Sequence, residues 1–258
     1  MPDPQPPTVG VFATCLVDLY RPSVARASVR LLEAAGCAVD MPAAQTCCGQ
    51  PVLNAGDRTG AARLARRLIA LYEGYDYTVA PSGSCAAVIK RQFPDLLADD
   101  PDWRARAVAL AERTHELTAF LTGVMRWRPA PPPAADPRVV TCHDACSGLR
   151  ELGIKAAPRR LLEGAGVTIA EMADAERCCG FGGLFAVKYD DISAAIGRRK
   201  LDSAVASGAD ELVAGELGCL LHLAGLAAAE GRSLRCRHIA ELLAGMDETP
   251  AIGEDAAG

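Results

Sequence analysis

The segment Arg177-Cys178-Cys179-Gly180-Phe181-Gly182-Gly183 contains two adjacent cysteines followed by a glycine. A second copy of this arrangement occurs at Thr46-Cys47-Cys48-Gly49-Gln50-Pro51. A single cysteine lies 32 positions before each pair, and another follows each pair. The repeated pattern predicts two related halves, each building one cysteine-ligated metal site. The eight cysteines of the pattern are Cys15, Cys47, Cys48, Cys85, Cys146, Cys178, Cys179 and Cys219.

The composition narrows the class of protein. Half of the 258 residues are hydrophobic and 23% are charged, which is typical of a soluble globular protein. The formal net charge of −5 disfavours nucleic acid and anionic membranes as partners. Residues 1–7 lack signal-peptide character, and the apolar run 217–229 is too short to span a bilayer. We therefore expect a cytoplasmic protein, in which reduced cysteines bind metal rather than form disulfides.

Short apolar runs alternate with helical patterns in the first half. Asp57 is a candidate cap for the helix that follows it, and Gly36 ends another. The polar residues 94–104 are expected to form a surface connection. Strands are expected at residues 9–14, 37–41 and 77–80, and helices at residues 24–35, 58–73 and 114–123.

The same order of elements restarts after a proline-rich stretch. The two halves are offset by 131 positions at the first cysteines and at the pairs, and by 134 at the last cysteines. Strands are expected at residues 138–141, 168–171 and 211–214, and a helix at 193–206. We expect a first domain at 1–128, a semi-rigid linker at 129–137, a second domain at 138–246 and a loose acidic tail at 247–258.

This alternation predicts an α/β protein made of two tandem similar domains, each a small parallel sheet flanked by helices. Every cysteine of the repeated pattern follows a predicted strand. In open parallel sheets the carboxyl ends of the strands lie along one edge. We therefore expect the metal sites at that edge, where residues far apart in the sequence meet.

Adjacent cysteines are unusual ligands for a single zinc ion, because structural zinc sites take their thiolates from turns that separate the two residues. In an iron–sulfur cluster, neighbouring thiolates can bind different irons. The glycine after each pair lets backbone N–H groups approach the sulfurs and offset their negative charge. Cys85 and Cys219 are expected at helix starts, where the helix dipole favours thiolate.

Other interpretations of the cysteines remain open. Each pair is also compatible with buried small apolar residues or with a strained vicinal disulfide. Cys37 and Cys236 lie in apolar surroundings and are expected in the core. Cys142 is an accessory candidate, four positions before Cys146. The intervening His143 and Asp144 are either a proton-handling pair near a cluster or residues with structural hydrogen bonds.

These motifs resemble the cysteine-rich CCG domain of iron–sulfur oxidoreductases, over nearly the whole chain. The resemblance is strongest to members that take part in L-lactate oxidation, in residues 12–18 (FATCLVD), 45–51 (QTCCGQP), 80–85 (APSGSC) and 143–153 (HDACSGLRELG). It implies an iron–sulfur electron-transfer subunit of a cytoplasmic system that oxidises lactate to pyruvate. The implied partners are a ferredoxin-like iron–sulfur subunit and a third small subunit.

The resemblance also implies the cofactor. Four thiolates in each half would hold an iron–sulfur cluster of the 4Fe-4S type, one or two per chain, and some relatives hold zinc in one half. The related CCG protein of heterodisulfide reductase ends each motif in C-x-x-C and so provides a fifth cysteine. Here Cys85 and Cys219 have no such partner, although His222 stands at that position in the second half. The alternatives are a zinc-stapled assembly subunit and a thiol–disulfide reductase acting through the paired cysteines.

Overall fold

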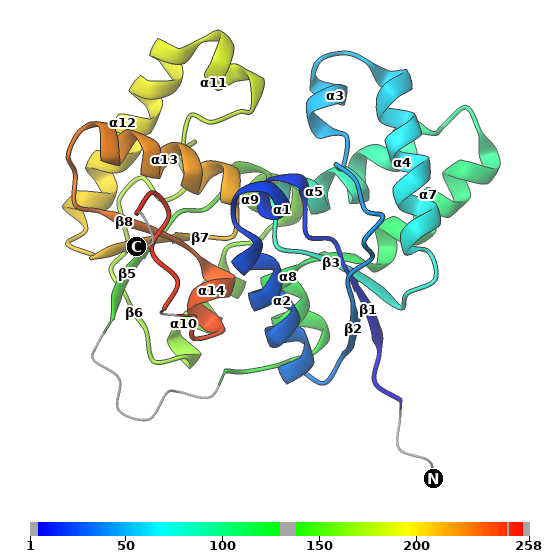
Figure 1. Cartoon of the computed structure of the whole chain (residues 1–258), viewed down its shortest axis with the longest axis horizontal. Helices are drawn as coiled ribbons and strands as arrows, with labels where there is room; N and C mark the ends of the chain where they lie inside the picture. Colours follow the sequence, from blue (N-terminus) through cyan, green and yellow to red (C-terminus); the bar gives the residue numbers. More distant parts are fainter. Residues whose placement is uncertain (1–4, 130–137, 247, 255–258) are drawn as a thin grey trace. The chain divides into compact units, whose positions relative to one another are not determined.

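A computed structural model describes residues 5–129, 138–246 and 248–254. The chain divides into a first unit, Met1–Met125, and a second unit, Arg126–Gly258. Each unit contains one four-stranded parallel sheet with helices around it (Figure 1). The confirmed fold class is therefore α/β with two similar units in tandem. Most of the expected linker, residues 130–137, lies outside the described residues.

The first unit begins with a strand and alternates strands with helices. Its elements are β1 (Thr8–Val11), α1 (Cys15–Tyr20), α2 (Pro22–Ala34), β2 (Ala38–Asp40), α3 (Gln50–Asn54), α4 (Arg58–Tyr72), β3 (Tyr77–Ala80), α5 (Gly83–Ala87), the π-helical turn η1 (Val88–Gln92), α6 (Phe93–Leu96), α7 (Pro101–Arg113), β4 (Thr114–Glu116), α8 (Leu117–Ala119) and the π-helical turn η2 (Phe120–Val124).

The second unit repeats this order with fewer short helices. Its elements are β5 (Val139–Cys142), α9 (Cys146–Leu152), α10 (Ala156–Gly164), β6 (Thr168–Ile169), α11 (Leu184–Lys188), α12 (Asp190–Ala206), β7 (Glu211–Ala214), α13 (Leu217–Ala229), β8 (Arg235–His238) and α14 (Ile239–Leu243). Within the described ranges, no helix combines the length and apolar character needed to cross a lipid bilayer.

Both sheets have the same strand order, β2-β1-β3-β4 in the first unit and β6-β5-β7-β8 in the second. In the first unit the chain passes from β1 to the edge strand β2, crosses back past β1 to β3, and then reaches β4 at the other edge. Right-handed crossovers therefore place α2 on one face of the first sheet and α4 and α7 on the other. Consistent with this, α4 and α7 contact each other (Figure 1). The switch point of this topology lies between β1 and β3, where ligands bind in open α/β sheets.

The main chain shows which residues of the two units are equivalent. The backbone N–H of Phe12, just after β1, donates to Val79 O at 2.9 Å. The N–H of His143, just after β5, donates in the same way to Val213 O at 2.9 Å. Phe12 and His143 therefore occupy the same position at the carboxyl edges of their sheets. Both side chains are buried.

The long helices α4 and α12 are equivalent as well. Their buried residues correspond one to one when 132 is subtracted from the residue numbers of α12. The buried residues of α4 at Ala61, Ala65, Leu68, Ile69 and Tyr72 then match Ser193, Gly197, Lys200, Leu201 and Ala204 of α12. The second unit thus buries a lysine where the first buries a leucine. As expected, α4 begins after Asp57, whose side chain accepts from Gly60 N at 2.7 Å.

Two expected elements differ in the structure. Residues 114–123 were expected to be helical, but Thr114–Glu116 form the fourth strand β4, because they pair in parallel with β3. Residues 94–104 were expected to be a surface connection, but α7 begins at Pro101. Asp100 caps α7 by accepting from Trp103 N at 3.3 Å. Each unit therefore has one strand more than the repeat predicts.

Residues 248–254 are also more ordered than expected. Residues 248–254 belong to the segment expected to be a loose tail, and Ala251 and Ile252 are buried. Ile252 forms an antiparallel bridge with Cys236 of β8, and Arg237 donates to Thr249 O at 2.8 Å. This part of the segment packs against the edge strand of the second sheet.

The glycine after each cysteine pair adopts positive φ, 88° at Gly49 and 96° at Gly180. An added methyl group at Gly49 would meet Leu64 at 3.6 Å, whereas one at Gly180 would overlap the carbonyl oxygen of Ser193 in α12. Gly49→Ala should therefore cost about 1–2 kcal/mol of stability for the left-handed backbone alone. Gly180→Ala should cost about 1–3 kcal/mol more, because it also overpacks against α12.

Urea unfolding of the metal-free variants, followed by circular dichroism, measures the difference. Equal losses of stability would contradict the assignment of close loop-to-helix packing to the second unit.

Candidate metal centres

The first centre lies at the carboxyl edge of the first sheet. Cys15 begins α1 after β1, Cys47 and Cys48 lie in the loop after β2, and Cys85 lies in the first turn of α5 after β3. Cys15 Sγ is 3.7 Å from Cys47 Sγ, and Cys48 Sγ is 3.4 Å from Cys85 Sγ. The sheet thus brings the four cysteines of the repeat together, and each adjacent cysteine faces a different outlying one.

Negative charge concentrates on Cys47 in this group. Hydrogen bonds from the thiols of Cys15 and Cys48, and from the N–H of Gly49 at 3.4 Å, lower the pKa of Cys47 to about 2. The same thiol contacts raise the pKa values of Cys15 and Cys48. The metal-free site therefore holds a thiolate next to protonated thiols, and a metal ion must displace those protons to bind.

The second centre has the same arrangement. Cys146 begins α9 after β5, the pair lies in the loop after β6, and Cys219 lies in the first turn of α13 after β7. Hydrogen bonds from Cys146 and Cys179, with the N–H of Gly180 at 3.3 Å, lower the pKa of Cys178 strongly. Contacts with Cys178 and Cys219 raise the pKa of Cys179, although the N–H of Phe181 donates to its sulfur at 3.4 Å.

His143 joins the second centre. One ring nitrogen of His143 and the sulfurs of Cys179 and Cys219 lie within 4.8 Å of one another, and all three residues are buried. Neither ring nitrogen forms a hydrogen bond of good geometry among the described residues, although the backbone of Ala175 lies close to the ring. Burial, together with the charge of Lys200, lowers the pKa of His143 to about 3, so the ring is neutral at physiological pH. Neutral imidazole is the form that binds metals.

No hydrogen bond joins Asp144 to His143, but Asp144 has the structural hydrogen-bonding role that the sequence suggested as one of two interpretations. Asp144 accepts two hydrogen bonds from the guanidinium of Arg159, at 2.8 and 3.0 Å. Lys200 is fully buried and donates to Ala175 O at 2.8 Å and to Asp174 O. Burial lowers the pKa of Lys200 to about 8, and the nearby sulfur of Cys179 opposes this shift. The second centre is thus surrounded by polar groups.

Of the remaining candidates, His222 lies beside the loop that carries the second cysteine pair, and the others lie in the core. His222 Nε2 faces Ser193 Oγ at 3.4 Å, and its ring lies 6.2 Å from that of Phe181. Cys142 packs in the apolar core of the second unit, and Cys37 and Cys236 are buried as expected. All eleven cysteines are free thiols.

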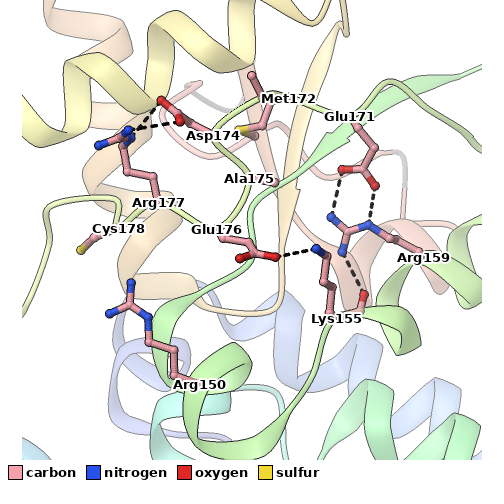
Figure 2. A pocket seen from close by; sticks show the side chains of 11 residues that line it. Arg150, Lys155, Arg159, Glu171, Met172, Asp174, Ala175, Glu176, Arg177 and Cys178 are labelled. Carbon is pink, nitrogen blue, oxygen red and sulfur yellow. Dashed lines mark hydrogen bonds and ion pairs between the residues drawn. The ribbon is translucent and has the colours of Figure 1, made fainter.

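A cavity of about 720 Å³ opens beside Cys178 (Figure 2). Its walls carry ion pairs: Lys155 with Glu176, Arg159 with Glu171, and Arg177 with Asp174. Arg150 also lines the cavity, and among the described residues it forms no hydrogen bond or ion pair. Cys178 is one of its lining residues, so the cavity reaches the second group of cysteines from the Cys178 side. The charged residues that line the cavity are Arg150, Lys155, Arg159, Glu171, Asp174, Glu176 and Arg177.

Comparison with known proteins agrees with the repeat. A family model described as the cysteine-rich CCG domain matches residues 9–90 and 140–224, one copy in each unit. The chain belongs to the CCG cysteine-rich domain family. Each matched range contains all four cysteines of its half. For this CCG protein, a metal centre is therefore expected at each of the two sheet edges.

Curated relatives match almost end to end. Lactate utilization protein A of Bacillus cytotoxicus is 40% identical over 236 residues, which is 91% of this chain and 98% of the relative. Lactate utilization protein A of Bacillus thuringiensis (strain Al Hakam) is 39% identical, with the same coverage of both chains. Among solved structures, a hypothetical protein from Helicobacter pylori aligns with a TM-score of 0.62 at 14% identity. The alignment covers 98% of this chain and 51% of that one, and it supports the fold alone.

The charge distribution predicts which thiols of the reduced, metal-free protein react first. Cys47 and Cys178 are half-buried and have lowered pKa values, whereas Cys48 and Cys179 are buried and have raised ones. Iodoacetamide should therefore modify the first cysteine of each pair before the second. Its rate should change little between pH 6 and 8, because these thiols are already ionised. An ordinary thiol slows by roughly tenfold per pH unit below its pKa.

Peptide mapping by mass spectrometry at short reaction times reads out each position. Cys236 is an internal control, because burial raises its pKa to about 12. Equal labelling of both members of a pair would contradict the charge distribution.

Proposed function

We propose that this protein is an iron–sulfur electron-transfer subunit of a cytoplasmic system that oxidises L-lactate to pyruvate. The observation that carries the proposal is the convergence of four cysteines at the switch point of each sheet. The curated relatives match this chain over nearly their whole length and are named for lactate utilization, which supports lactate as the substrate. The cytoplasm suits the proposal because thiol ligands stay reduced there.

The pairing of the sulfurs favours a cluster over a single ion. Within the first unit, Cys47 approaches Cys15 while Cys48 approaches Cys85. Adjacent cysteines that each face a different outlying cysteine fit a cofactor that offers several metal atoms, whereas a structural zinc site gathers four ligands around one atom. The ligands would be Cys15, Cys47, Cys48 and Cys85 in the first unit, and Cys146, Cys178, Cys179 and Cys219 in the second.

The residues around the ligands would tune such a centre. Backbone N–H groups of Gly49, Gly180 and Phe181 already donate to cysteine sulfurs at 3.3–3.4 Å. Hydrogen bonds to sulfur stabilise the more negative, reduced form of an iron–sulfur centre and thereby raise its potential. A bound cluster would supply one-electron transfer between a donor and an acceptor.

Oxidation of lactate to pyruvate removes two electrons and two protons. The sequence has no glycine-rich dinucleotide fingerprint after a strand, so we assign hydride chemistry to no part of this chain. We propose that the electrons pass to a ferredoxin-like iron–sulfur partner, and that a third small subunit completes the complex. The half-buried Cys146 and Cys178 mark the more accessible side of the second centre.

An anaerobic count of iron, acid-labile sulfide and zinc per chain tests the cofactor. Iron with sulfide supports the proposal. Zinc alone favours a non-enzymatic, zinc-stapled subunit instead. Activity that survives chelators and is lost on alkylation favours thiol–disulfide exchange at the paired cysteines.

A pair of serine variants tests the ligand assignment. Cys179→Ser should remove the iron of the second unit, because serine replaces a soft thiolate ligand poorly. The stability of that unit should fall as well, since metal binding contributes to folding free energy. Cys236→Ser is the matched control: this buried cysteine lies in β8, so its loss should cost about 1–3 kcal/mol and leave the iron content unchanged.

Iron per chain in the two variants and the wild type gives the answer. Equal iron in all three proteins rejects Cys179 as a ligand. Comparable losses in both variants show that the ligand set is wrong.

Growth tests the substrate. In the native host, a chain carrying both Cys47→Ser and Cys178→Ser should abolish growth on L-lactate and leave growth on pyruvate intact, because only the oxidation step is lost. The Cys236→Ser chain should support growth on both. Normal growth of the double variant on lactate would refute the lactate assignment.

A further inference from the structure

His143 is an unusual residue to enclose in a protein. Its side chain is 4% exposed, and neither ring nitrogen forms a hydrogen bond of good geometry among the described residues, although the backbone of Ala175 lies close to the ring. Leaving a buried polar group unpaired costs about 1–3 kcal/mol. The ring lies within ligand distance of the sulfurs of Cys179 and Cys219. A metal ion held between these atoms would satisfy one ring nitrogen and offset that cost.

Packing alone does not explain the imidazole. The equivalent residue of the first unit is Phe12, which has the same backbone hydrogen bond and is also fully buried. An apolar ring therefore fills this position of the fold without any unpaired nitrogen. The second unit has a polar ring at this position, beside two cysteines of the repeat.

We propose that His143 is a nitrogen ligand of the metal centre in the second unit. That centre would be a mixed thiolate–imidazole site, whereas the first unit binds its metal through thiolates alone. The inference rests on the proposed function only in assuming that the second unit binds a metal. His143 would be the fifth donor of the second unit, in addition to the four cysteines of the repeat.

A second difference between the units also makes the surroundings of the second centre more polar. The buried Lys200 of α12 stands where α4 has Leu68, and its charge interacts with those of Cys179 and Cys219. A neutral imidazole adds a donor without adding charge, and a buried ammonium offsets thiolate charge. Histidine ligation raises the potential of iron–sulfur centres relative to thiolate ligation. The second centre would therefore be the more easily reduced of the two.

Binding of Co²⁺ to the full chain tests the ligand directly. A Cys47→Ser/Cys48→Ser background disables the first site, so that the probe reports on the second. Proton NMR of the Co²⁺ protein should show a strongly shifted, exchangeable imidazole N–H resonance that disappears in D₂O. ¹⁵N-histidine labelling should split this resonance. A histidine that only fills space gives no such signal.

His143→Phe, which introduces the residue that the first unit uses, should abolish the resonance and weaken Co²⁺ binding by about tenfold or more. His222→Phe is the matched control, because His222 lies near the same loop but outside the group of three; it should keep the resonance. Thiolate-to-cobalt absorption with no shifted imidazole signal in the histidine-containing protein overturns the proposal, as does a failure to bind Co²⁺. The spectrum of the histidine-containing protein decides this whether or not the variants fold.

The outcome separates this inference from the proposed function. Iron and sulfide counts decide whether the chain carries clusters, and the cobalt spectrum decides whether His143 binds metal. Iron bound in full, with no histidine signal, would reject the ligand and leave the electron-transfer proposal standing. A histidine signal in a chain that takes up zinc but no iron would support His143 as a ligand and reject the electron-transfer proposal.

Discussion

Both centres depend on the way that parallel strands align. With the order β2-β1-β3-β4, the first and third strands of the sheet are neighbours, so the residues that follow them meet at a switch point. Cys15 and Cys85 follow these two strands, and the adjacent pair arrives from the loop after β2. No local sequence segment contains more than two of the four cysteines. The site therefore exists only when the sheet has formed, so metal binding there would be coupled to the folding of its unit.

Much of this could be predicted because the signals were local or repeated. Asp57 caps α4, and the cysteine spacing located both centres. The fourth strands could not be predicted in this way: Thr114–Glu116 are three residues of mixed polarity directly before a helical turn, and pairing with β3 decides their conformation. Helix α7 had a usable local signal, the Asp100 cap followed by Pro101, which the acidic composition of the segment obscured.

The site shows the same division between local and tertiary information. His222 occupied the position at which a related protein has its fifth cysteine, yet its ring lies against Ser193 on α12. His143 was noted for its place between two cysteines and was considered as a partner of Asp144, which instead binds Arg159. The useful signal was in the repeat: aligning the halves sets His143 against Phe12, and a polar residue that replaces an apolar one at a buried position needs a reason.

The two halves thus keep the same cysteine frame and differ in what surrounds it. In the first unit the buried residues Phe12 and Leu68 are apolar; in the second, His143 and Lys200 occupy the equivalent buried positions. Duplicated centres with identical surroundings would have similar potentials, and electrons would gain little by moving from one to the other. If both units bind iron–sulfur clusters as proposed, their different surroundings would separate the potentials, because a nearby cation stabilises the more negative, reduced form. A duplicated fold can in this way give one chain two centres of unequal affinity for electrons, which gives electron transfer a direction.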